Sequence, residues 1–91
     1  MQFTRATACE YAPDRIRINA VNSGFADTAF LTHREGRTGA DEFQELLISK
    51  HPWGRIATAE DIAEVCVLMA GSGVQFTTGQ PFVVDGGYTL P

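Results

Sequence analysis

The chain has 91 residues and a formal net charge of -4; 44% of its residues are hydrophobic and 20% are charged. A chain this short is at most one domain and leaves a large share of its surface exposed, so it is marginally stable by itself. The acidic balance, with no basic stripe, excludes a nucleic-acid-binding surface. No apolar run is long enough to cross a membrane.

Residues 1–12 predict a helix, because they are rich in alanine and contain neither Gly nor Pro before Pro13, where a helix must end. No Ser, Thr, Asp or Asn stands ahead of this pattern as an N-cap. Such a start is expected where a chain has been cut within a helix, although a natural helix can also begin at a terminus.

Residues 16–21 predict a strand, with Ile16, Ile18 and Ala20 on one face. The segment that follows leaves the carboxyl end of this strand, which is where α/β sheets bind ligands. We expect residues 25–31 to open a short helix capped by Asp27 or Thr28. A helix start of this kind suits a phosphate, but a plain capping role is commoner for such a residue.

Residues 32–39 are polar and contain two glycines, which predicts a surface loop. A lid over a substrate is the functional interpretation of this loop. Arg34 and Arg37 would then meet an anionic group, whereas solvated charges are the more common explanation of isolated arginines on such a stretch.

Residues 41–50 predict a helix, with acidic residues at its start and Phe43, Leu46 and Leu47 on one face. His51 and Pro52 end it. A histidine at this place more often hydrogen-bonds the last carbonyl oxygens of the helix than acts as a general base, so we expect a structural role for His51.

The next helix is predicted to start at Thr58, whose side chain can accept a hydrogen bond from the N–H of Asp61 in a variant of the capping box. Its apolar stripe, which predicts packing against a sheet, consists of Ile62, Val65, Cys66 and Met69. Gly71 can supply the C-cap.

The two cysteines, Cys9 and Cys66, lie far apart in predicted helices, and neither has a partner at metal-ligand spacing. We therefore expect small buried thiols and no metal site. Nothing in the chain favours a disulfide, so the expected compartment is reducing, and the cytoplasm is the default.

The last strand is predicted at residues 82–84, an apolar, β-branched run of the kind that is covered on both faces. Asp85, Gly86 and Gly87 end it, because glycine permits a positive φ. Two strands separated by a long helical stretch must be parallel if they share a sheet. The predicted class is therefore α/β.

Several strings, in this order, resemble the short-chain dehydrogenase/reductase family in its classical branch. Singly each is weak, but their shared order and spacing make a strong signal; the strings are Glu10-Tyr11-Ala12-Pro13, Ile16-Arg17-Ile18-Asn19-Ala20-Val21, Gly24, His51-Pro52-Trp53-Gly54-Arg55, Thr58 to Ala63, Thr78-Gly79-Gln80 and Val83-Val84-Asp85-Gly86-Gly87. The resemblance covers the whole chain but only the back third of a family member.

This resemblance implies the C-terminal part of a Rossmann-like doubly wound parallel sheet, with about two parallel strands and three to four helices in this chain. Residues 1–91 would form a single partial domain, with a substrate loop near residues 29–50. The family's final strand and the helix before it form subunit contacts, so a homo-oligomer is also implied.

The resemblance further implies an NAD(P)-dependent oxidoreductase acting on an alcohol or carbonyl substrate. By this alignment Gly24 belongs to the turn beside the nicotinamide, the backbone of Ala26 faces its carboxamide, and Thr28 bonds the carboxamide or the pyrophosphate. Ser23 stands where proline is usual, which leaves the turn less rigid. The residue that separates NAD from NADP follows an earlier strand.

The catalytic residues that the family uses are absent from these 91 residues, so no catalytic residue is assigned. The missing parts are the Gly-rich loop, the active-site Ser and the Tyr-x-x-x-Lys pair. Tyr11 cannot replace that tyrosine, because Arg15 stands four residues later and Pro13 breaks the helix. Tyr88 is no better placed. Whether the chain is itself an enzyme is therefore left open.

Three hypotheses follow for the chain. It is part of an oxidoreductase that is inactive alone and binds no cofactor tightly, or a non-catalytic homo-oligomerising module, or a small anion-binding domain built on residues 24–28. We favour the first for its origin and the second for its behaviour in isolation, since two strands are too few to be stable alone.

Overall fold

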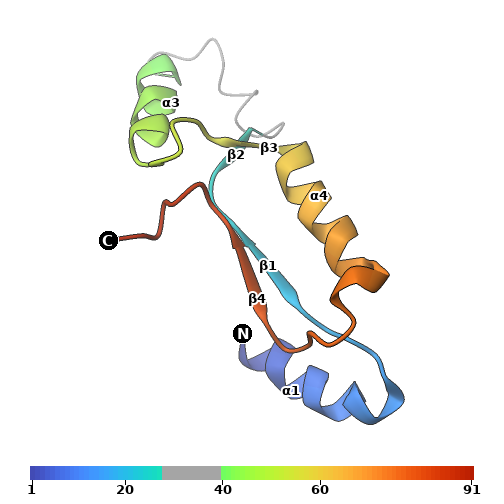
Figure 1. The fold of residues 1–91 in the computed structure, drawn as a ribbon. Coiled ribbons are helices and arrows are strands. Elements are labelled where there is room, and N and C mark those ends of the chain that lie inside the picture. Colours follow the sequence, from blue (N-terminus) through green and yellow to red (C-terminus); the bar gives the residue numbers. More distant parts are fainter. Residues whose placement is uncertain (28–39) are drawn as a thin grey trace.

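The computed structural model describes residues 1–27 and 40–91, and Figure 1 shows their arrangement. The chain is an α/β structure whose strands pair in parallel, as predicted. In chain order the elements are α1 (Gln2–Tyr11), η1 (Ala12–Asp14), β1 (Ala20–Ser23), β2 (Ala26–Asp27), α3 (Ala40–Ser49), β3 (Ala57–Thr58), α4 (Ala59–Ala70), η2 (Ser72–Val74) and β4 (Pro81–Val84).

The strands form two parallel pairs, β1 with β4 and β2 with β3. The first pair ends where the N–H of Gly24 donates to the carbonyl of Val84 at 3.1 Å, and the second begins where the N–H of Ala57 donates to the carbonyl of Phe25 at 3.0 Å. Residues 20–27 therefore exchange one partner strand for another across Gly24 and Phe25. We call this divergence of β4 and β3 the fork.

The predicted start of the first strand, at residue 16, is wrong, because β1 begins at Ala20. Side chains take the place of the backbone ladder before it. The N–H of Ile18 donates to the hydroxyl of Thr78 at 3.1 Å, and the Asn19 amide bridges the Thr77 carbonyl and the Gln80 N–H. These residues pair with the segment before β4 without forming a strand.

The helix predicted over residues 25–31 is also wrong at its start, because Ala26 and Asp27 form β2. Pairing with β3 holds this stretch extended, and a local helix signal carries no information on that distant partner. Thr28 and the predicted lid, with Arg34 and Arg37, lie at 28–39 and so outside the described residues.

The helices match the sequence predictions closely. α3 covers Ala40–Ser49, one residue earlier than expected. Thr58 caps α4 with a complete capping box, accepting from the N–H of Asp61 while the Asp61 carboxylate accepts from the N–H of Thr58. Gly71 follows the last turn, and its N–H donates to the Leu68 carbonyl. The start and end of α4 were therefore predicted correctly.

Arg17 fastens the far end of α4 to the segment that leads into β1. Its guanidinium donates to the carbonyls of Met69 at 2.7 Å, Gly71 at 3.0 Å and Val74 at 3.1 Å. A helix C-terminus leaves carbonyl oxygens unpaired and carries partial negative charge, so the cationic guanidinium with its several N–H donors stabilises it. Figure 1 shows α4 beside β1.

The core is small and the chain is elongated. Its Cα radius of gyration is 16.3 Å and its extents are 53 × 28 × 24 Å, whereas a compact chain of this length would have a radius of about 12 Å. Among the described residues, the buried side chains are Ala8, Leu47, His51, Ile56 and Met69. Little apolar surface is thus withdrawn from water within the chain.

Two burial predictions fail for the same reason. Cys9 and Cys66 are exposed rather than buried, and Val83 is 56% exposed although its strand was expected to be covered on both faces. Their sequence patterns are those of buried positions, but no element of the described chain covers them. Phe82 and Val84, on the alternate face, are half-buried.

Candidate functional site at the carboxyl ends of the strands

The candidate site lies at the fork, where β1 and β4 both end. Ligands of α/β proteins bind outside the carboxyl ends of parallel strands. Gly24 stands at this point with its Cα close to the next segment, since a Cβ there would lie 3.0 Å from Asp85 Cβ and 3.3 Å from His51 Nε2. The backbone has room to pass only because residue 24 has no side chain.

His51 reaches the fork from the end of α3. Its Nδ1 lies 2.6 Å from the Leu47 carbonyl oxygen, which confirms the predicted bond to the end of the helix. The imidazole is 3% exposed. Its ring centroid lies 6.2 Å from that of Phe25, edge to face, and 5.1 Å from that of Tyr88. Three chain segments therefore meet around one buried ring.

Asp85 organises the turn that follows β4. Its carboxylate accepts from the hydroxyl of Thr89 at 2.7 Å and from the N–H groups of Gly87 at 2.9 Å and Thr89 at 3.0 Å. The Thr89 hydroxyl is the largest cause of the lowered pKa of Asp85, and nearby His51 contributes. Gly86 and Gly87 take the predicted positive φ, 57° and 89°. This turn is consequently well defined in place and charge.

Two hollows flank these residues. The turn hollow, of about 410 Å³, is lined by Asn22, Ser23, Gly24, Phe25, Val83, Asp85, Tyr88 and Thr89. The Trp53 hollow, of about 500 Å³, is lined by residues that include His51, Pro52, Trp53, Arg55, Asp61, Val83 and Leu90. The turn hollow has an aromatic wall and polar groups at the strand ends, so its lining suits a small planar ligand better than that of the Trp53 hollow.

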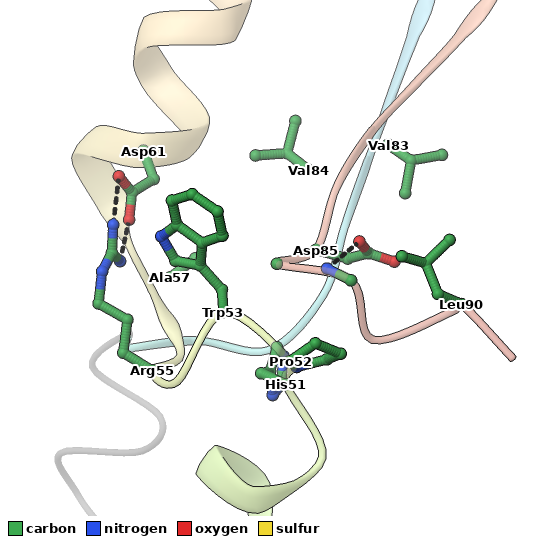
Figure 2. A pocket seen from close by; sticks show the side chains of 12 residues that line it. His51, Pro52, Trp53, Arg55, Ala57, Asp61, Val83, Val84, Asp85 and Leu90 are labelled. Carbon is green, nitrogen blue, oxygen red and sulfur yellow. Dashed lines mark hydrogen bonds and ion pairs between the residues drawn. The ribbon is translucent and has the colours of Figure 1, made fainter.

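Arg55 and Asp61 form the polar wall of the Trp53 hollow, shown in Figure 2. The two side chains make an ion pair with one N···O distance of 2.6 Å. Hydrogen bonds from the Arg55 guanidinium, and then from the N–H of Thr58, hold the pKa of Asp61 well below its usual range. This carboxylate is already satisfied by the capping of α4, which argues for a structural rather than a chemical role.

The structure places the predicted cofactor residues as follows. Gly24 lines the turn hollow, and Ala26 is in β2, opposite Ala57 in the ladder. Thr28 lies outside the described residues. Tyr11 ends α1, whose carboxyl end lies at the other end of the molecule from α3 in Figure 1.

The described part of the chain brings no three His, Cys, Asp or Glu side chains together as a metal site. Nor does any of its helices combine the length and apolarity needed to span a membrane.

Sequence reasoning did not anticipate Phe25, Asp85 and Tyr88 as neighbours around His51. The Asp-Gly-Gly string gave a usable signal for the turn at Asp85, since an aspartate before glycines commonly bonds the N–H groups ahead of it. Phe25 and Tyr88 carried no such signal, because their contact is made only when β1 and β4 pair.

Parallel strands, flanking helices and a glycine turn at the strand ends are features of Rossmann-like α/β proteins. A family model described as enoyl-(acyl carrier protein) reductase matches residues 1–89. The chain belongs to the short-chain dehydrogenase/reductase family, as its motifs indicated.

Individual relatives agree with this assignment. The chain is 37% identical over 88 residues to cyclohexanol dehydrogenase of Acinetobacter sp. (strain SE19), covering 96% of this chain and 32% of that protein. A short chain dehydrogenase family protein from Francisella tularensis superposes with a TM-score of 0.87 at 31% identity, over 99% of this chain and 40% of that one.

The structure of ElxO with NADP bound gives a TM-score of 0.82 at 32% identity, over 96% of this chain and 34% of that one. The chain thus spans about a third of the length of the curated relatives it matches.

Proposed function

We propose that this chain is the C-terminal part of an NAD(P)-dependent oxidoreductase that moves hydride between a nicotinamide and an alcohol or carbonyl substrate. The observation that carries the proposal is the glycine turn at the carboxyl ends of two parallel strands, beside the turn hollow, in a chain of this family. A related structure has NADP bound, and a relative at 37% identity is a cyclohexanol dehydrogenase.

The turn fits a nicotinamide on chemical grounds. Phe25 and Tyr88 form an aromatic wall with ring centroids 5.5 Å apart, and Asn22 and Ser23 add polar groups to the same hollow. The cofactor would supply or accept the hydride. Gly24, Ala26 and Thr28 would hold its nicotinamide end.

Residues 29–50 form the substrate loop in this proposal. Its support within the described residues is α3, whose end returns to the fork through His51. In this proposal the substrate lies between the Gly24 turn and the end of α3. The exclusion of water from that space favours hydride transfer over side reactions.

The 91-residue chain alone is proposed to be inactive. Reduction of a carbonyl needs a proton donor, and the family's tyrosine serves this purpose with its pKa lowered by a lysine. Tyr11 has Arg15 four residues later, and Lys50 is the only lysine in the sequence. No Tyr-x-x-x-Lys pair can therefore form within these residues.

The test separates chemistry from binding. Purified chain is mixed with NADH or NADPH and cyclohexanone, and absorbance at the nicotinamide band is followed; we expect no turnover, and measurable turnover would overturn the inactivity. Nuclear magnetic resonance with millimolar NADH, NADPH or AMP then maps weak binding. Shift changes at residues 24–26 with NADH but not AMP support the nicotinamide assignment, and equal changes with AMP contradict it.

We also propose that the chain forms homo-oligomers, which its surface favours. Val67, Leu68 and Val83 are 72%, 58% and 56% exposed on α4 and β4, and unpaired strand edges readily associate. Sedimentation of the pure chain at micromolar concentration should give a species larger than a monomer; a single monomeric boundary would oppose this. A cytoplasmic location completes the proposal, supported by two free thiols at Cys9 and Cys66.

A further inference from the structure

The imidazole of His51 is the most unusual buried group of the described chain. The other buried side chains are those of Ala8, Leu47, Ile56 and Met69, all apolar. Burial of a polar ring is unfavourable unless its nitrogen atoms find partners. A histidine kept at 3% exposure in so small a core calls for a structural reason.

One ring nitrogen belongs to α3. Nδ1 lies 2.6 Å from the Leu47 carbonyl oxygen, and because a carbonyl can only accept, Nδ1 carries the hydrogen. This bond fixes the tautomer and the orientation of the ring against the last turn of the helix. The second nitrogen, Nε2, is buried and has no hydrogen-bond partner in the described ranges 1–27 and 40–91.

The other edge of the ring lies against the fork, near Gly24 and Gly86. A Cβ on Gly24 would lie 3.3 Å from Nε2, and a Cβ on Gly86 would lie 3.7 Å from Cδ2. The ring therefore fills the space between the backbone that leaves β1 and the backbone that leaves β4. Phe25 and Tyr88 close around it, and Asp85 lies within electrostatic reach.

We propose that His51 is a positioning residue that couples the end of α3 to the Gly24 turn. Nδ1 holds the ring to the helix, and the opposite edge of the ring packs beside Gly24, in the space between the backbone that leaves β1 and the backbone that leaves β4. The end of α3 is thereby held beside the Gly24 turn. The value of this coupling for nicotinamide placement rests on the proposed function, whereas the coupling itself does not.

Two substitutions separate the two contacts of the ring. His51→Asn keeps an amide N–H where Nδ1 stands and removes the ring edge that faces Gly24. His51→Phe keeps a ring and removes the donor to Leu47. Hydrogen exchange of the 91-residue chain reports both ends: the N–H of Gly24, bonded to Val84, reports the turn, and the N–H of residue 51, bonded to Ile48, reports the end of α3.

The Ala20 N–H is the internal control, since it donates to Gln80 at the opposite end of the same strand pair. General destabilisation accelerates exchange at Ala20 and Gly24 alike. We expect His51→Asn to raise the exchange rate of the Gly24 N–H about tenfold relative to that of Ala20, which is the scale of a lost buried contact. The exchange rate of the residue 51 N–H should not change. His51→Phe should raise the exchange rate of the residue 51 N–H, while the ratio of the Gly24 rate to the Ala20 rate stays within about threefold of its value in the parent chain.

An unchanged ratio in His51→Asn, or an equal rise in both variants, would overturn the coupling. Should either variant fail to fold, Gly24→Ala tests the contact from the other side, because its Cβ approaches Nε2. The ¹⁵N resonances of the His51 ring must then shift, and unshifted resonances contradict the proposal. NADH titration of the parent chain is scored separately: no shifts at residues 24–26 would remove the nicotinamide assignment while the exchange result stands.

Discussion

Among the cationic residues that the structure describes, Arg17 should be the one whose replacement lowers the stability of the chain most. Arg17→Ala deletes three N–H···O bonds, one to the Met69 carbonyl in the last turn of α4 and two to the carbonyls of Gly71 and Val74 after the helix. No other side chain donates to these oxygen atoms in the described part of the chain. The variant therefore leaves the end of α4 detached from the segment that leads into β1.

The size of the effect follows from the geometry. Two of the three bonds are partly buried and one is exposed, and the freed carbonyls can take up water. Counting about 1 kcal/mol for each partly buried bond, and about 0.5 kcal/mol for the lost cation at a helix C-terminus, gives a loss of about 2–3 kcal/mol. For a chain with so small a core, this is a large share of its stability.

Urea unfolding followed by far-ultraviolet circular dichroism measures this loss. Arg17→Lys should lose about half as much as Arg17→Ala, because an ammonium keeps the charge but cannot span three carbonyls. Arg5→Ala is the matched control; its side chain is exposed on α1, and the expected change is within about 0.5 kcal/mol. Equal losses for Arg17→Ala and Arg5→Ala would refute the reasoning.

Three further outcomes are expected. Thr58→Ala should cost about 1 kcal/mol of unfolding free energy, whereas Thr58→Ser, which keeps the cap, should cost less than half of that; equal costs would dismiss the capping box. The folded-state pKa values of Asp61 and Asp85 lie below the ordinary aspartate value of 3.8. The two ionised carboxylates therefore stabilise the fold fully above pH 3.8, and this stabilisation is lost as the pH falls further. The urea midpoint should drop on acidification, and it should drop less in the double Asp→Asn variant. Gly87→Ala should destabilise more than Gly54→Ala although both have φ near 90°, because only at Gly87 would a Cβ meet the Pro52 ring, at 3.1 Å; similar losses would show that backbone strain alone decides.

The parts of the fold that depend on interactions between residues close in sequence could be predicted. The cap at Thr58, the helix end at Pro13 and the glycine stop after β4 each depend on residues within a few positions. The start of β1 could not be predicted, because the side chain of Asn19 bonds residues about 60 positions away and replaces the ladder there. β2 and β3 each have two residues, too few to leave a periodic pattern.

The candidate site divides in the same way. Gly24 and the Asp85 turn are marked by residue types that a tight backbone needs, and the bond from His51 to its helix follows from position alone. The contact of His51 with Gly24 depends on the pairing of β1 with β4, which no short window of sequence contains. The exposure of Cys66 and Val83 could not be predicted either, because an apolar sequence pattern indicates burial but does not indicate which element covers the residue.

The fork has a consequence for the order in which the chain acquires its structure. Its two ladders join residues that are far apart along the chain; Asn19 and Gln80, next to the first ladder, are 61 positions apart. The closure of such long loops is slow and entropically unfavourable compared with the formation of helices α1, α3 and α4. The Gly24 turn is complete only after both closures, so we expect it to form late. Any partner that holds β3 and β4 together therefore acts directly on the proposed nicotinamide turn, without touching it.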